Sequence, residues 1–162
     1  MDNRQLTFRK ATADDIDLID SFIRGIAEYE KMEDQIVYAK DELKDELFNK
    51  KAAFAEFLVF DNKEIGYAIY YYSFSTFKGH RGFYLEDLFI LPGYRNLGFG
   101  KKTFSHLARI ALHEGCRRFE WVCLNWNKPS ISFYQSIGAK PLAEWTTYRL
   151  DKKGIEKIAS EN

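Results

Sequence analysis

A short glycine-containing segment, residues 95–101, follows a stretch rich in aromatic residues. The residues after it show the spacing of apolar side chains that is typical of a helix. Pro92 and Gly93 end the aromatic-rich stretch, and apolar residues then recur from Phe104 to Leu112 as on one face of a helix. Glycines let the backbone approach a ligand closely, and the first amides of a helix point outward at the positive end of its dipole. These features predict a phosphate-binding loop, which consists of Arg95, Asn96, Leu97, Gly98, Phe99, Gly100 and Lys101.

Two familiar glycine motifs do not fit this loop. A P-loop requires glycine at the position of Arg95 and serine or threonine at that of Lys102, and the Rossmann motif requires glycine at that of Thr103. The remaining pattern is Arg-x-x-Gly-x-Gly after a strand. A glycine-rich turn that binds nothing is the alternative, but the adjacent basic residues favour a ligand with phosphate groups.

The strand expected before the loop, Phe83–Leu91, carries two charges, Glu86 and Asp87. Adjacent residues of a regular strand point to opposite faces, so one carboxylate is expected to point inward. We expect Glu86 to be half-buried among apolar neighbours, because burial raises the pKa of a carboxylate and suits it to act as a general base. A salt bridge or a hydrogen-bond anchor in the sheet is the alternative role.

Composition indicates one soluble globular domain over residues 1–162, with 46% hydrophobic residues, 14 Phe and 10 Tyr. No apolar run approaches the ~20 residues of a membrane span, and the first ten residues lack the apolar core of a signal peptide. The two cysteines, Cys116 and Cys123, form no disulfide framework. These features predict a cytoplasmic protein that does not bind a membrane.

Zero net charge argues against a general nucleic-acid-binding surface. The charge is nevertheless uneven, because residues 14–46 hold 12 acidic and 4 basic residues, a net −8 that the rest of the chain balances. The acidic part could attract a cationic substrate and the remainder an anionic cofactor. Two solvated helix faces are the alternative explanation.

Hydrophobic periodicity predicts an α/β domain with a mixed sheet. The helix between two of its strands forms a right-handed crossover, so those two strands are expected to be parallel, with ligands at their carboxyl ends. The expected strands are Leu6–Lys10, Phe54–Phe60, Ile65–Phe74, Phe83–Leu91, Arg118–Leu124 and Ala139–Leu150. The expected helices are Thr12–Tyr29, Lys40–Phe48, Lys101–Leu112 and Ser130–Ile137, with a further helical turn or two in Asp151–Ala159.

Several segments beyond the glycine loop give the chain a specific resemblance. They are Arg9–Asp15, Tyr29–Glu33, Tyr84–Asp87 and Asn125–Tyr134. With these segments the chain resembles, over nearly its full length, the GNAT N-acetyltransferases, and in particular the group of spermidine/spermine and thialysine acetyltransferases. The resemblance implies a GNAT-type mixed, mostly antiparallel sheet with a central parallel strand pair and flanking helices.

The resemblance also implies direct transfer of an acetyl group from acetyl-CoA to a primary amine, without a covalent intermediate or a metal. Glu86 would accept the amine proton, directly or through a water, and Tyr134 would donate a proton to the departing thiolate. Leu88 and Ile90 would offer backbone groups to the pantetheine arm, and Asn127 would bind that arm or cap the following helix. Packing in an amphipathic helix is the alternative role for Tyr134.

For the acceptor amine, the resemblance implies Glu30, Glu33 and Asp87 as partners of a cationic group. Walls for a methylene chain would come from Tyr29, Met32 and Trp126. Polyamine enzymes of this group carry an acidic residue and a tryptophan where this chain has Ser75 and Phe77, and an aromatic residue where it has Lys31. The expected acceptor is therefore a small di- or polyamine or an amino-acid-like amine such as thialysine, and these differences count against a long polycation.

Other functions remain open at this level. The chain could acetylate a protein lysine or amino terminus, or bind an acyl-CoA as a regulatory module without catalysis.

The three histidines show no metal-ligand spacing, and Cys123 is expected to be an unreactive residue that packs in the interior. A homodimer that pairs through the sheet edge and the carboxyl-terminal strand is expected from the resemblance.

Overall fold

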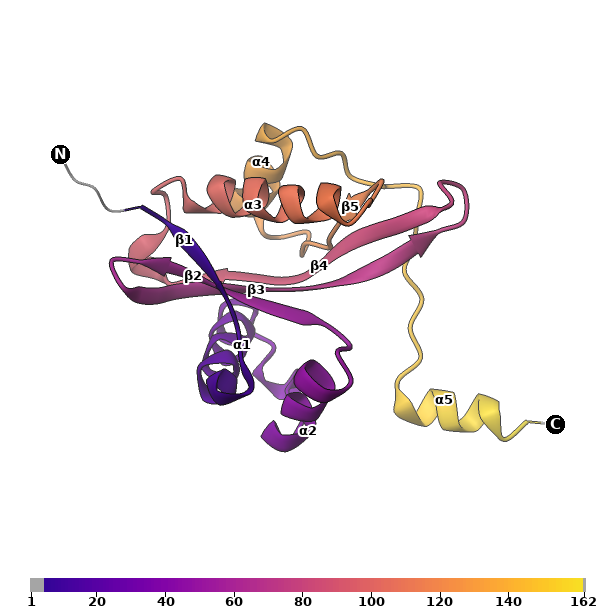
Figure 1. Ribbon diagram of the computed structural model, residues 1–162. Coiled ribbons are helices and arrows are strands. Elements are labelled where there is room, and N and C mark those ends of the chain that lie inside the picture. The colour runs from indigo at the N-terminus through magenta and orange to yellow at the C-terminus, as the bar shows by residue number, and fades with distance from the viewer. Residues whose placement is uncertain (1–4, 162) are drawn as a thin grey trace. The chain divides into compact units, whose positions relative to one another are not determined.

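The computed structural model describes residues 5–161 (Figure 1), which divide between Val122 and Cys123 into two compact units. The first unit contains a five-stranded sheet in the order β1-β2-β3-β4-β5. Neighbouring strands are antiparallel except β4 and β5, which are parallel and are joined by helix α3. The predicted α/β fold with a central parallel pair is thus confirmed. The strands are β1 (Thr7–Lys10), β2 (Phe54–Phe60), β3 (Lys63–Ser75), β4 (His80–Ile90) and β5 (Phe119–Glu120).

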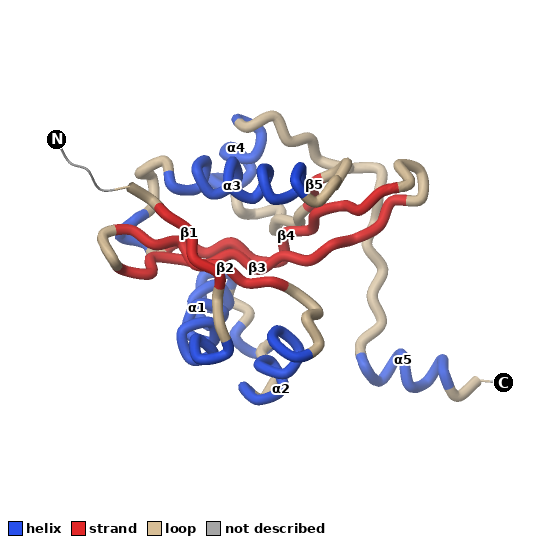
Figure 2. The backbone as a smooth tube through the Cα atoms, in the orientation of Figure 1, coloured by secondary structure: helices blue, strands red, loops and turns tan. Residues whose placement is uncertain are grey.

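Helices cover both faces of this sheet, with α1 and α2 on one face and α3 on the other (Figures 1 and 2). The α-helices of the first unit are α1 (Ile16–Glu30), α2 (Lys40–Lys44) and α3 (Phe99–His113), and single turns occupy η1 (Ala13–Asp15), η2 (Glu33–Gln35), η3 (Asp45–Asn49) and η4 (Pro92–Tyr94). The apolar stripe of α1 buries Ile19 and Phe22 against Phe57, Tyr67 and Phe89 of the sheet.

Asp15 fixes the start of α1. Its carboxylate accepts hydrogen bonds from the backbone and hydroxyl of Thr12 and from both terminal nitrogens of Arg9 at 2.9 Å. These contacts, chiefly the one with Arg9, lower the pKa of Asp15 to about 2. The first strand is thereby tied to the first helix.

A β-bulge at Glu86 changes which face each later residue of β4 occupies. Ile69 of β3 pairs with Asp87 but the next residue, Tyr70, pairs with Leu85, so Glu86 is the extra residue. Before the bulge, Phe83 contacts Phe119 on the α3 face; after it, Phe89 packs against α1 on the other face. Asp87 therefore lies on the face that α1 covers.

The strand predicted over Arg118–Leu124 is wrong in length, because β5 contains only Phe119 and Glu120. These residues pair with Phe83 and Tyr84, and Tyr84 lies two residues before the bulge at Glu86. Because a bulge bends its strand and increases the local twist, it carries the rest of β4 away from β5. The parallel pairing ends at that point.

The second unit contains two helices, α4 (Lys128–Ser136) and α5 (Lys152–Ala159). The strand predicted over Ala139–Leu150 is wrong, since this segment forms turn and loop (Figure 2). A strand requires a neighbour to complete its backbone hydrogen bonds, and the sheet described for residues 5–161 offers it none. Trp145 and Tyr148 of this segment are exposed.

A polar network lies in the core between α3 and the sheet. Glu56 of β2 is 4% exposed, and its Oε2 lies 2.5 Å from His106 Nε2 on α3. The hydroxyl of Tyr70 donates to the other carboxylate oxygen at 3.4 Å, and Phe8 stacks on the imidazole at a centroid distance of 3.9 Å. A buried carboxylate depends on such partners, since leaving it unpaired is costly.

We predict that His106→Leu lowers the free energy of unfolding by about 2–3 kcal/mol, because the substitution removes a partner from a buried carboxylate. Urea unfolding would measure the change. His113→Leu is the matched control, since that histidine lies on the same helix with a side chain that is 86% exposed. Equal unfolding midpoints for the two variants would contradict the assigned role of the network.

Candidate active site

The glycine loop leads directly into the N-terminus of α3. Gly98 is the N-cap of α3 and has φ +78°, in the left-handed region that glycine adopts without strain. A Cβ built on Gly98 would meet no described atom within 4 Å, so the space beside the loop is open. The first turn of α3 contains no acidic residue. The loop fits the predicted phosphate site.

Arg95 is positioned by contacts within the protein. Its Nε donates to the carbonyl oxygen of Ile90 at 2.8 Å, and its Cζ lies 4.9 Å from the ring centroid of Tyr29 and 5.4 Å from that of Phe89. The side chain therefore connects the loop to the end of β4 and to the last turn of α1. This structural role was not predicted from sequence.

The edge of β4 that faces away from β3 is open after Tyr84, within the described residues. Because Leu91 N–H donates to Ile65 of β3, and alternate residues direct their backbone groups to alternate sides, Leu88 and Ile90 direct theirs to the open edge. This arrangement suits the predicted backbone contacts of Leu88. The carbonyl of Ile90 already accepts from Arg95.

An acidic cluster lies where the end of α1 meets β4. Asp87 is half-buried and accepts a hydrogen bond at Oδ2 from the hydroxyl of Tyr67, 2.6 Å away. Burial raises the pKa of Asp87, and the hydrogen bond opposes that rise. Burial and the charge of Asp87 together raise the pKa of Glu30, the last residue of α1. A cation would stabilise this site, because the charge of Asp87 opposes the ionisation of Glu30.

Glu86 is exposed, so the prediction that it is the half-buried carboxylate is wrong. The reason is the bulge, which places Asp87 toward α1 and leaves Glu86 as the extra residue. Burial raises the pKa of the nearby phenol Tyr71, and the charges of Glu86 and Glu120 add to that rise. A role for Glu86 as base does not require burial and stays a prediction.

The other residues of the first unit that were predicted to bind the acceptor lie close together in the sequence, at the end of α1 and in η2. Tyr29 precedes Glu30, and its ring lies beneath the guanidinium of Arg95. Met32 is half-buried at the start of η2, whereas Glu33 is exposed. The structure therefore brings Glu30 under the influence of the charge of Asp87, places Tyr29 against Arg95, and leaves Glu33 exposed to solvent.

Sequence reasoning missed Tyr67 and Tyr38. The hydroxyl of Tyr38 donates to Asp20 at 2.7 Å, and the pKa of Tyr38 is raised mainly by burial, with a contribution from the charge of Asp87. Without the strand register, neither tyrosine could be assigned to Asp87.

In the second unit, Asn127 caps α4. Its side-chain oxygen accepts from the backbone N–H of Ser130 at 3.4 Å, which fits the capping role predicted as one alternative. Tyr134 lies seven residues later on the same helix, and its ring contacts that of Phe133 at a centroid distance of 5.6 Å. Trp126 is half exposed next to the cap.

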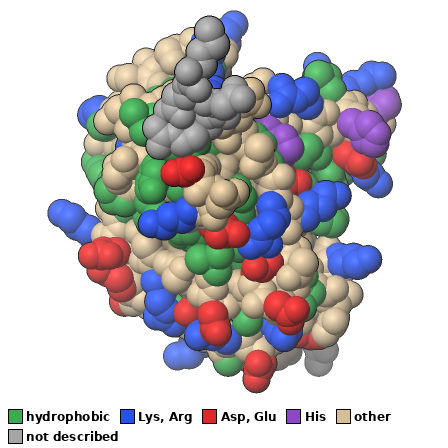
Figure 3. Space-filling model, turned by 60° about the vertical axis from the view of Figure 1, so that its left-hand side comes forward, with side chains coloured by type: hydrophobic (Ala, Val, Ile, Leu, Met, Phe, Trp, Pro, Cys, Tyr) green, Lys and Arg blue, Asp and Glu red, His purple; other side chains and the backbone are tan. Residues whose placement is uncertain are grey.

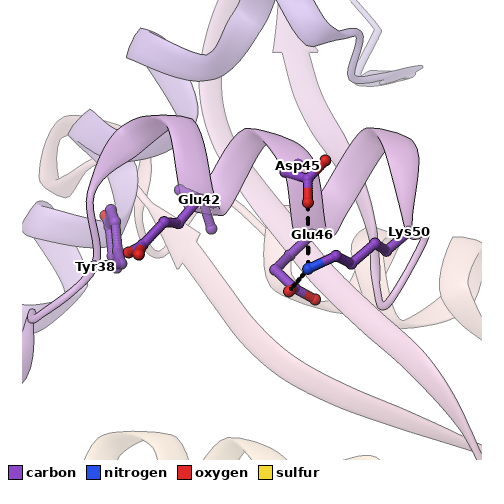
Figure 4. Close-up of a pocket in the computed structure, with 6 residues that line it drawn as sticks. Tyr38, Glu42, Asp45, Glu46 and Lys50 are labelled. Carbon is purple, nitrogen blue, oxygen red and sulfur yellow. Dashed lines mark hydrogen bonds and ion pairs between the residues drawn. The ribbon is translucent and has the colours of Figure 1, made fainter.

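Two of the cavities in the first unit contain no predicted site residue. One of about 430 Å³ is lined by Tyr38, Glu42, Leu43, Asp45, Glu46 and Lys50 (Figure 4). Lys50 there contacts Asp45 at 3.2 Å and Glu46 at 2.5 Å, so its charge compensates the carboxylates. The other, of about 670 Å³, is lined by Lys78, Ala108, Ala111, Leu112, Cys116, Arg117, Arg118 and Phe119.

Other kinds of site receive no support from the described residues. Within residues 5–161, no group of three or more His, Cys, Asp or Glu side chains is arranged to hold a metal ion. No described helix is long and apolar enough to cross a membrane. On the face shown in Figure 3, basic and acidic side chains are interspersed.

Solved structures similar to this one share its fold. An integron cassette protein from the mobile metagenome of V. cholerae superposes with a TM-score of 0.79 at 26% sequence identity and covers 96% of this chain and 98% of that one. The aminoglycoside N-acetyltransferase AAC(6')-Iy, solved in complex with CoA, has a TM-score of 0.71 at 16% identity and covers 91% and 96%.

Several sequence relatives are named as acetyltransferases. The thialysine N-epsilon-acetyltransferase of Sus scrofa is 33% identical over 165 residues, covering 94% of this chain and 96% of that protein, and that of Caenorhabditis elegans is 34% identical over 154 residues, covering 93% and 94%. The L-ornithine N5-acetyltransferase of Arabidopsis thaliana is 34% identical over 97 residues, covering 60% and 42%.

The family pattern extends across both units, because the acetyltransferase (GNAT) family matches residues 19–139. The organisation of residues 1–162 as a single domain stays a prediction. The chain belongs to the acetyltransferase (GNAT) family and is an acyl-CoA-dependent N-acetyltransferase.

Proposed function

We propose that this protein transfers the acetyl group of acetyl-CoA to a primary amine of a small amino-acid-like or diamine acceptor. The observation that carries the proposal is the half-buried carboxylate of Asp87, which Tyr67 holds by a hydrogen bond of 2.6 Å and whose charge adds to burial in raising the pKa of the half-buried Glu30. Such a site favours a ligand with a second cationic group besides the amine that reacts. Relatives named for thialysine and L-ornithine, which are amino-acid amines, support the same acceptor class.

The residues of the donor site fit acetyl-CoA, whose thioester supplies the activated acetyl carbonyl. The pyrophosphate would lie on the loop from Arg95 to Lys101, at the start of α3. The pantetheine arm would lie along the open edge of β4 and hydrogen-bond to Leu88 and Asn127. Because the carbonyl of Ile90 is occupied by Arg95, Ile90 would contribute its N–H.

In the proposed reaction one bond forms, one bond breaks and two protons are transferred. The amine nitrogen bonds to the acetyl carbon as the carbon–sulfur bond breaks. Glu86 would take the proton from the amine, directly or through a water, and Tyr134 would give a proton to the departing sulfur. Glu30 and Asp87 would hold the second ammonium group and thereby orient the reacting one.

The features around the acceptor site favour a short acceptor. Lys31 directly follows Glu30 and adds a positive charge that a long polycation would have to pass. Ser75 and Phe77 supply no negative charge to the hairpin between β3 and β4. An amino-acid-like amine with its own carboxylate tolerates such a lysine better.

We also propose a cytoplasmic homodimer. Both cysteines are free, which agrees with a reducing compartment. The segment predicted as the last strand exposes the large apolar side chains of Trp145 and Tyr148, and exposed apolar side chains of this size favour association. In a dimer this segment would gain a neighbouring strand from the partner subunit.

To test catalysis, release of free thiol from acetyl-CoA would be measured with thialysine, lysine, ornithine, putrescine, spermidine and lysine-bearing peptides. We expect turnover with a short amine, and a fall in kcat of about 10²-fold for Tyr134→Phe because the proton donor is lost. Tyr72→Phe is the matched control.

Turnover with peptides alone would favour a protein acceptor over a small one. Binding of acetyl-CoA without thiol release for any amine would favour a regulatory module.

Asp87→Asn should weaken acceptor binding and stabilise the fold. Removing the charge is expected to raise the acceptor KM about tenfold or more. Because the pKa of Asp87 is raised on folding, its ionised form reduces stability at pH 7, and the reduction disappears as both states become protonated at lower pH. The variant should therefore melt higher than wild type at pH 7, with a gap that narrows toward pH 4. A lower melting temperature at pH 7 would count against a destabilising charge at Asp87.

Sedimentation equilibrium would test the dimer. We expect the wild type to be dimeric at micromolar concentration and the Trp145→Asp/Tyr148→Asp variant to be monomeric, because carboxylates would be buried at the contact. Lys140→Asp/Glu144→Lys alters exposed charges of the same loop and serves as the control. A monomeric wild type would refute the proposal.

A further inference from the structure

We propose that Tyr67 is a positioning residue for the acceptor, because its hydroxyl holds one oxygen of Asp87 and leaves the other for the cationic group of the amine. The expected effect of Tyr67 on catalysis rests on the proposed function. The contact between Tyr67 and Asp87 does not depend on that function, and it can be tested in the protein alone.

The ring of Tyr67 is held in the core and cannot easily change its orientation. Tyr67 is 0% exposed and stacks on Phe22 of α1 with ring centroids 5.5 Å apart and an interplanar angle of 17°. Gly66 sets the approach of the two strands at this point, since a Cβ there would lie 2.2 Å from the carbonyl oxygen of Phe89. Because the ring is fixed by packing, the hydroxyl of Tyr67 is held in one position relative to Asp87.

The strand register brings the hydroxyl to Asp87. Tyr67 pairs with Phe89 and Ile69 pairs with Asp87, so Tyr67 and Asp87 are diagonal neighbours across β3 and β4. The bulge at Glu86 places Asp87 on the same face of the sheet as Tyr67. The resulting hydrogen bond is 2.6 Å long, a length typical of a charge-assisted bond from a hydroxyl to a carboxylate.

A phenol donates one proton, so it satisfies Oδ2 and leaves Oδ1 available to accept from an ammonium group. Burial and the charge of Asp87 raise the pKa of Tyr67 well above its ordinary value, so the hydroxyl stays a donor throughout the physiological range. A carboxylate that is held at one oxygen loses little rotational freedom when it binds the acceptor.

The hydrogen bond also keeps Asp87 charged. Burial raises the pKa of Asp87 and the bond from Tyr67 lowers it. The charge of Asp87 also raises the pKa values of Glu30 of α1 and of Tyr38, which precedes α2. Tyr38 donates to Asp20, which is paired in turn with Arg24 and approached by Lys40. Tyr67 is thus the group whose removal shifts Asp87 toward its neutral form.

If the hydroxyl of Tyr67 only stabilised the fold, its removal would have the same effect on catalysis as the removal of another buried hydroxyl from β3. Tyr70 provides the matched control for this comparison. Tyr70 lies on the same strand, is also buried, and donates its hydroxyl to a carboxylate, that of Glu56. It does so on the opposite face of the sheet, beneath α3. Tyr70→Phe therefore removes a buried hydroxyl from β3 without touching the acceptor site.

The experiment compares Tyr67→Phe with Tyr70→Phe in the full-length protein, with the best amine of the panel as acceptor. For Tyr67→Phe we expect the acceptor KM to rise about tenfold while the KM for acetyl-CoA changes less than about twofold. The acidic limb of kcat/KM for the acceptor should move to higher pH, because Asp87 becomes harder to ionise. Tyr70→Phe should leave both quantities unchanged.

The second measurement needs no activity. The side-chain carboxyl carbon of Asp87 is followed by NMR as a function of pH in the wild type and in Tyr67→Phe, and its titration midpoint should be higher in the variant. An unchanged midpoint would overturn the inference, and so would equal kinetic losses in the two tyrosine variants. If no amine is acetylated but the midpoint moves, the proposed function fails while the contact that Tyr67 makes stands.

Discussion

The bulge at Glu86 is the constraint on which the rest of the site depends. One extra residue in β4 reverses the faces of everything after it, so that Phe83 and Phe89, six positions apart, pack on opposite sides of the sheet. The same bulge ends the pairing with β5 after Tyr84 and opens the edge of β4. It thus frees the edge along which the donor is proposed to lie and turns Asp87 toward the face where the acceptor is proposed.

Each face of the sheet then holds a half-buried or buried carboxylate with a tyrosine hydroxyl. On the α3 face, Glu56 has both Tyr70 and His106 as partners, and its polar atoms are satisfied within the protein. On the α1 face, Asp87 has Tyr67, but its carboxylate neighbour is Glu30, which adds negative charge. The first arrangement stabilises the fold, whereas the second carries negative charge that a positive group from outside the chain would compensate.

Sequence periodicity was sufficient to predict those elements whose buried face depends only on residues close together in the chain. The 3,4 spacing from Ile16 to Tyr29 predicted α1, and glycine and proline marked the loop before α3. The bulge could not be predicted, because an extra residue is defined only by the register of the partner strand, and the pairing of Tyr67 with Asp87 depends on it. The strand expected over Ala139–Leu150 failed for a related reason, since its aromatic residues have strand propensity but no neighbouring strand in the described chain.

Arg95 shows how the donor loop and the acceptor side share one support. The guanidinium bonds to the end of β4 and covers Tyr29, whose neighbour Glu30 belongs to the acidic cluster. A guanidinium is planar and keeps its charge, so it can stack on an aromatic ring and donate a hydrogen bond at the same time. A displacement of the glycine loop would therefore be transmitted to the last turn of α1. The proposed direct transfer would need both substrates in register, and Arg95 would give the two proposed sites a common support without a covalent intermediate.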